Sequence, residues 1–60
     1  MFEVNEKVKL TPEALQKYGK HWEFITFVIL EIQKNEEYIV RTTLNVPVGF
    51  QIQENDLIYA

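Results

Sequence analysis

One apolar segment constrains the fold of this chain more than any other feature, and it runs from Trp22 to Gln33. It is rich in β-branched and aromatic side chains, which fit a pleated, partly buried surface. We therefore predict a single long β-strand over Trp22–Gln33. Both faces of this strand are apolar in the middle, unlike a strand with one face in water. Either the strand bends so that its two halves give different faces to the core, or its odd-numbered face is covered by a helix or a second subunit.

The odd-numbered face carries Ile25, Phe27 and Ile29. If the strand does not bend enough to bury them, these three side chains form an exposed apolar strip of the kind that marks an interface. They are therefore candidate partner-binding residues, together with the nearby aromatic residues Tyr18 and Trp22. The partner would be another protein, with a homodimer as an alternative.

A first strand is predicted over Glu6–Leu10, with Phe2 and Val4 in a flap before it. The next segment, Thr11–Gly19, carries the signals of a short helix over residues 12–18. Thr11 suits the N-cap, and the residue after it is proline, which suits the first helical position. Gly19 suits the left-handed position that follows a helix.

A polar turn over Lys34–Glu37 separates the long strand from the next one, and Asn35 can supply a positive φ there. The two strands form a hairpin. The elements predicted after this turn are a strand over Tyr38–Leu44, a break over 45–49, a strand over Phe50–Ile52, a 3₁₀ turn over Glu54–Asp56 and a last strand over Leu57–Tyr59.

The order of these elements resembles the small Src-homology-three-like barrels of phage and bacterial chromosomes. Two motifs carry the resemblance: the run Val-Lys-Leu-Thr-Pro-Glu-Ala over 8–14, and the closing pair Asp56-Leu57. The resemblance implies a mainly β protein, a five-stranded barrel with one short helix inserted after the first strand. It also implies a phage or mobile-element origin, but it selects no partner, because barrels of this type bind peptides, proteins, RNA and DNA. The lack of a catalytic constellation leads us to expect a non-enzymatic accessory protein that binds another protein. Barrels of this type that read polyproline do so in an aromatic groove, for which the candidates are Tyr18, Trp22, Tyr38 and Tyr59.

The chain has 60 residues, which fits a single domain over 1–60 near the lower limit for a core without disulfides or metals. It contains no cysteine, so disulfides and thiolate zinc sites are excluded. The apolar run is far shorter than the roughly 20 residues that a membrane-spanning helix needs. We expect a cytoplasmic protein that does not contact membranes.

Candidate catalytic groups are sparse. His21 and Glu23 have the spacing of a metal-binding or acid–base pair on a strand, but no further ligand is signalled. The acidic pairs Glu36-Glu37 and Glu54/Asp56 are better explained by turn solubility and capping than by hydrolysis. We expect no enzymatic activity, no cofactor and no metal.

The alternative function is nucleic-acid binding by the locally basic N-terminal third, through Lys7, Lys9, Lys17 and Lys20. The net charge of −3 opposes it. The acidic remainder of the chain, from Glu31 through Asp56, also opposes it and suggests a polarised surface, which is equally consistent with a protein partner.

Overall fold

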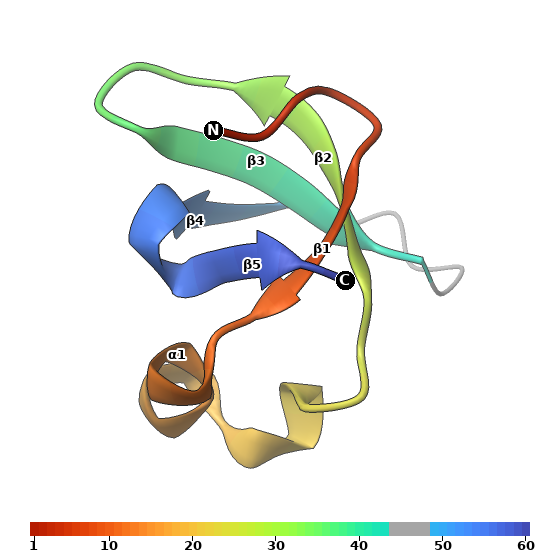
Figure 1. Ribbon diagram of the computed structural model, residues 1–60, viewed down its shortest axis with the longest axis vertical. Coiled ribbons are helices and arrows are strands. Elements are labelled where there is room, and N and C mark those ends of the chain that lie inside the picture. Colours follow the sequence, from red (N-terminus) through yellow and green to blue (C-terminus); the bar gives the residue numbers. More distant parts are fainter. Residues whose placement is uncertain (44–48) are drawn as a thin grey trace.

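The computed structural model of the chain describes residues 1–43 and 49–60. It is mainly β, with five antiparallel strands in one sheet and one α-helix. Figure 1 shows the helix and the following 3₁₀ helix together at one end of the molecule, with the strands beyond them. In chain order the elements are β1 (Lys7–Leu10), α1 (Pro12–Tyr18), η1 (Lys20–Trp22), β2 (Phe27–Ile32), β3 (Glu37–Thr42), β4 (Phe50–Gln53), η2 (Glu54–Asp56) and β5 (Leu57–Tyr59).

The strands lie in the order β4-β3-β2-β1-β5. The last strand therefore pairs with the first, with Val8 opposite Tyr59, while β2, β3 and β4 follow one another as a meander. Strands β4 and β5 form the two edges of this sheet, and the short 3₁₀ helix η2 joins them. The prediction of a mainly β fold with a short helix after the first strand is confirmed.

The helix has the predicted boundaries and caps. The Thr11 hydroxyl accepts a hydrogen bond from the Ala14 backbone N–H (3.1 Å), and proline occupies the first turn. The helix ends at Gly19, whose N–H donates to the Leu15 carbonyl (2.8 Å) and whose φ is +123°. This positive φ is the conformation for which a glycine was expected.

The long strand predicted over Trp22–Gln33 is wrong in its first part, since β2 begins only at Phe27. Residues 20–22 form a 3₁₀ helix, and backbone hydrogen bonds from Glu23 to Lys20 (3.0 Å) and from Ile25 to Trp22 (3.1 Å) continue the turn. These local bonds satisfy the backbone groups that a strand would have paired with a neighbour. The apolar side chains here pack from a turn instead of a sheet.

A β-bulge in β2 resolves the question of its two apolar faces. Ile29 lies opposite Val40, but the next pair is Glu31 with Ile39, so Leu30 is an extra residue. Before the bulge the odd-numbered Phe27 is buried, and beyond it the even-numbered Ile32 lies opposite the buried Tyr38. The side chains on the side of Tyr38 therefore change from odd to even numbers at the bulge, but Ile32 is 49% exposed, so β2 contributes to the core only before the bulge, through Phe27 and Ile29.

The core includes residues from every strand and from the helix. Phe2 is also buried, so the segment before β1 packs onto the sheet as expected, whereas Val4 is exposed. The buried hydrophobic residues are Phe2, Val8, Leu10, Ala14, Phe27, Ile29, Tyr38, Val40, Ile52 and Leu57.

The later elements agree closely with the predictions. Asn35 has a φ of 63° in the hairpin turn, and Glu36, which was not predicted to, has a φ of 59°. The 3₁₀ turn and the last strand have the predicted boundaries. Leu44 and the break over 45–49 lie outside the described residues, apart from Gly49.

Candidate functional site

An open hollow lined by apolar and aromatic side chains lies between the helical end of the molecule and the sheet, with a volume of about 190 Å³. We call it the aromatic groove. Its floor consists of buried core residues, and its walls are aromatic rings that remain partly accessible to solvent. The floor residues are Leu10, Phe27 and Ile52, and the wall residues are Tyr18, Trp22 and Phe50.

Three separate elements supply the walls. Tyr18 ends α1, Trp22 ends η1 and Phe50 begins β4. The Trp22 ring lies 5.8 Å from the rings of both Phe27 and Phe50, centroid to centroid, and meets Phe50 edge to face. Such offset and edge contacts are the favourable geometries for aromatic pairs. The turn at Gly19 thus places Trp22 against Phe50, although these two residues are far apart in the sequence.

The ring of Tyr18 is held at the rim of the aromatic groove by Asp56. The Tyr18 hydroxyl donates to Asp56 Oδ2 (3.2 Å), and the Lys17 ammonium donates to the same oxygen (3.3 Å). The hydrogen bond to Asp56 is the main reason that the pKa of Lys17 is raised above its ordinary value. Asp56 thereby ties the last turn of α1 to η2.

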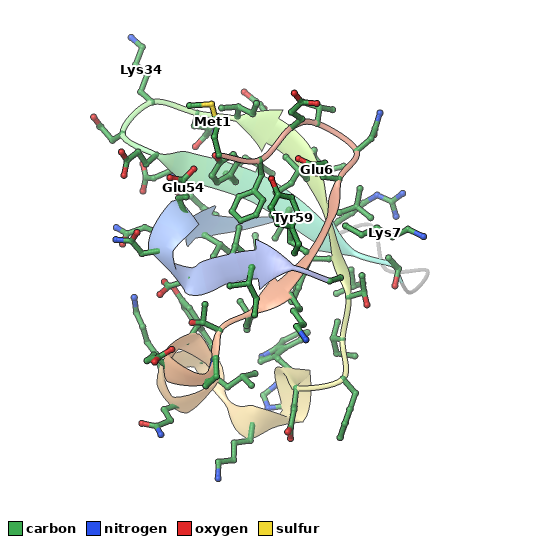
Figure 2. All side chains as sticks on the ribbon, viewed as in Figure 1. Met1, Glu6, Lys7, Lys34, Glu54 and Tyr59 are labelled. Atoms are coloured by element: carbon green, nitrogen blue, oxygen red, sulfur yellow. The ribbon has the colours of Figure 1, made fainter. Side chains whose placement is uncertain are left out.

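Tyr38 and Tyr59, which were also predicted to line an aromatic groove, lie elsewhere. Both pack edge to face on Phe2, with ring centroids at 5.6 and 4.9 Å. The Tyr38 hydroxyl donates to Glu54 Oε1 (2.6 Å) and accepts from the Phe2 N–H (3.1 Å). Figure 2 shows Met1, Glu54 and Tyr59 together on this side of the molecule. The prediction was wrong for these two residues, because Tyr38 is buried and Tyr59, although 57% exposed, packs on Phe2 away from the aromatic groove.

The hydrogen bond to Glu54 is also the main reason that the pKa of Tyr38 is raised. A phenolate at this position would face the carboxylate and would lose the bond that the neutral hydroxyl donates. The pair is therefore a structural link between β3 and η2.

Of the five predicted partner-binding residues, the structure brings Tyr18, Trp22 and Phe27 to the aromatic groove, Tyr18 and Trp22 as accessible walls and Phe27 as part of the buried floor. Phe27 and Ile29 are 3% and 0% exposed, so the exposed apolar strip predicted as one alternative does not form. Ile25 packs against the same core and is partly buried. Phe50 was missed, because its role depends on contacts with residues more than twenty positions away. Homodimerisation stays a prediction.

The four lysines predicted to bind nucleic acid come from three elements, and nucleic-acid binding by them stays a prediction. Lys7 and Lys9 are exposed on β1, whereas Lys17 is engaged by Asp56 and Lys20 lies on η1. Figure 2 shows Lys7 projecting outward from β1.

The His21 ring contacts the Trp22 ring in a tilted arrangement, with ring centroids 4.7 Å apart and an interplanar angle of 43°. Within residues 1–43 and 49–60, no group of three or more acidic or histidine side chains is arranged to hold a metal ion. Glu54 and Asp56 are instead occupied by the hydroxyls of Tyr38 and Tyr18.

Comparisons with known proteins identified no relative of this chain. No family model, no curated protein and no solved structure matches this chain. In the part of the chain that the structure describes, neither the length nor the apolarity of any helix is sufficient to cross a membrane.

Proposed function

We propose that this protein is a non-enzymatic interaction module that binds an extended, proline-containing peptide in the aromatic groove. The observation that carries the proposal is the arrangement of three partly accessible aromatic rings around a buried apolar floor. Grooves lined by aromatic rings select the polyproline II conformation, which is already extended and loses little entropy on binding. A phage or mobile-element accessory role remains part of the proposal because of the sequence resemblance.

We also propose that the sheet belongs to a Src-homology-three-like barrel. The strand order β4-β3-β2-β1-β5 and the bulge in β2 support this, because a bulge bends a strand and increases its twist. The three-residue helix η2 supports it as well, since it joins the two edge strands by a very short connection.

Polar groups at the rim suit a peptide backbone. The Tyr18 hydroxyl and the Asp56 carboxylate lie next to the aromatic groove. A polyproline II backbone makes no hydrogen bonds within itself, so its carbonyl groups are free to accept bonds. The donor available at this rim is the Lys17 ammonium, which keeps further N–H groups beside its bond to Asp56, because the Tyr18 hydroxyl already donates to Asp56 and a carboxylate only accepts. Apolar contact with the rings would supply affinity, and the rim would orient the chain.

The chain contains a single tryptophan, and this residue forms a wall of the aromatic groove. Its fluorescence therefore reports occupancy directly. We expect a decaproline peptide to shift the Trp22 emission saturably, whereas an alanine- and serine-rich peptide of equal length does not. Tyr18→Ala removes one wall while keeping the fluorophore, and it should weaken binding about tenfold or more.

Phe24→Ala is the matched control, since Phe24 is 91% exposed and lies outside the aromatic groove. It should change the affinity less than about twofold. Tyr18→Phe keeps the ring and separates the contribution of the hydroxyl from that of the ring. Equal responses to the two peptides, or equal losses from Tyr18→Ala and Phe24→Ala, would contradict the proposal.

A further inference from the structure

The outer face of the sheet, where β1, β2 and β3 lie side by side, carries a row of cationic residues. On the inner face, Val8, Phe27 and Thr42 are directly opposite one another and are buried. Because side chains alternate along a strand, the adjacent row points outward. That row is Lys7, Val28 and Arg41, in register across the three strands.

Lys9 extends this row along β1. It lies two residues after Lys7, on the same side of the strand, and opposite Ile58 of β5. Strand geometry places Lys7 and Lys9 about 7 Å apart, and Lys7 and Arg41 about 10 Å apart across two strand spacings, measured between Cα atoms. We call Lys7, Lys9 and Arg41 the outer cationic face.

These charges are not neutralised by neighbours. Within the described residues, the ion pairs join other groups, and none involves a residue of the outer cationic face. Glu31, opposite Ile39, lies beyond the bulge on β2. Glu23 lines a shallow hollow next to Lys9 without forming an ion pair with it. Lys7 and Arg41 therefore have less negative charge beside them than Lys9 has, on a chain whose net charge is −3.

We propose that the outer cationic face binds the phosphodiester backbone of a nucleic acid. Phosphate contacts need only side-chain cations at a surface, and arginine and lysine are the usual donors. β2 is paired on both sides here, with β1 and with β3. It therefore offers no free backbone edge to which an acidic peptide could add a strand. A basic face on paired strands, with no free strand edge among Lys7, Val28 and Arg41, fits phosphates better than an extended peptide.

This surface is distinct from the one predicted from the sequence. It retains Lys7 and Lys9, omits Lys17 and Lys20, and adds Arg41 from a strand distant in the sequence. Residues of the aromatic groove do not contribute to it, so the protein would carry two independent binding surfaces.

The test compares two double variants that remove the same charge. Lys7→Gln/Arg41→Gln changes the outer cationic face, whereas Lys20→Gln/Lys34→Gln changes exposed lysines outside it. Figure 2 shows Lys34 at the hairpin tip, well away from Lys7. The probes are a fluorescein-labelled oligouridylate and a DNA duplex, each about 20 nucleotides or base pairs long, measured by anisotropy from about 50 to 200 mM salt.

We expect wild type to bind at low salt, with log K falling against log salt at a slope of about −2 to −3 for three phosphate contacts. Lys7→Gln/Arg41→Gln should reduce the slope to about −1 and weaken binding about tenfold or more at the lowest salt. Lys20→Gln/Lys34→Gln should stay within about twofold of wild type. The two probes show whether single or double strands are preferred.

Several results would overturn the inference. The first is that the wild-type protein binds neither probe. The second is that the two double variants weaken nucleic-acid binding equally. The third is that the wild-type protein binds a poly-glutamate peptide more tightly than either nucleic acid, which would make the face a protein-binding surface. Circular dichroism checks folding, and the single variants Lys7→Gln and Arg41→Gln replace the double variant if it does not fold. Tyr18→Ala should leave nucleic-acid binding unchanged, so this test and that of the aromatic groove fail independently.

Discussion

Replacing Gly19 by alanine tests how the fold places Trp22 in the aromatic groove. Gly19 has φ +123° and ψ 137°, a region that only glycine adopts readily. An added Cβ would also lie 2.7 Å from His21 Cε1 and 2.8 Å from His21 Nδ1. Two separate penalties therefore act at this position: backbone strain and displacement of the His21 ring from Trp22.

The size of each penalty follows from the geometry. A residue held in such a backbone region costs roughly 1–3 kcal/mol. Loss of the tilted ring contact between His21 and Trp22, whose centroids are 4.7 Å apart, adds about 0.5–1.5 kcal/mol. We expect Gly19→Ala to reduce the free energy of unfolding by about 1.5–4.5 kcal/mol. Since a chain of this length has only about 3–9 kcal/mol in total, the midpoint of thermal unfolding should fall by about 10–30 °C.

Urea unfolding followed by circular dichroism measures this loss, and a double-mutant cycle with His21→Ala separates its two parts. In the His21→Ala background the ring contact is absent, so the cost of Gly19→Ala should fall to the backbone part alone. Gly49→Ala is the matched control, because Gly49 does not have the positive φ of Gly19 and a Cβ there would meet Ile39 Cγ2 at 3.2 Å and the Val40 carbonyl oxygen at 3.9 Å. The reasoning is refuted if Gly19→Ala costs less than about 0.5 kcal/mol, or if its entire cost disappears with the His21 ring.

Two further predictions concern β2 and the Tyr38–Glu54 pair. Ile29→Ala should cost about 2–5 kcal/mol, while Leu30→Ala, at the bulge and 41% exposed, should cost less than about 1 kcal/mol. Equal losses in urea unfolding would contradict the burial of Ile29 and the exposure of Leu30. The pKa of Tyr38 is raised from 10.0 in the folded protein, mainly by its hydrogen bond to Glu54. This bond stabilises the fold fully below pH 10, where the Tyr38 hydroxyl is protonated in both the folded and the unfolded state. The stabilisation is lost as the pH rises through the raised pKa of the folded state. Wild type should therefore lose more stability than Tyr38→Phe in urea unfolding above about pH 10, and parallel pH curves would exclude this role.

Local sequence signals predicted the helix and the turns well. The threonine cap, the proline after it and Gly19 each act within a few residues, so their meaning did not depend on the rest of the chain. The same holds for Asn35 in the hairpin turn. β-Propensity failed around Trp22 and Phe24, because a 3₁₀ turn there is fixed by the backbone of Gly19 and by ring contacts with distant strands.

The candidate site was only partly predictable for the same reason. Tyr18 and Trp22 were identified because aromatic residues near a helix end are conspicuous in a short chain. Phe50 was not, since nothing local distinguishes it from an ordinary core residue. The alignment of Lys7 with Arg41 could not be predicted either. It depends on the pairing register of three strands, and the sequence of one strand does not determine that register.

The pairing of β1 with β5 also has a consequence for the order of folding. The strands β2, β3 and β4 are consecutive and can pair through short separations, whereas Val8 and Tyr59 must meet across almost the entire chain. Closing that loop costs entropy before any contact is gained. We infer that the meander forms early and that β5 docks last. Substitutions in β5 would then accelerate unfolding while leaving the folding rate nearly unchanged.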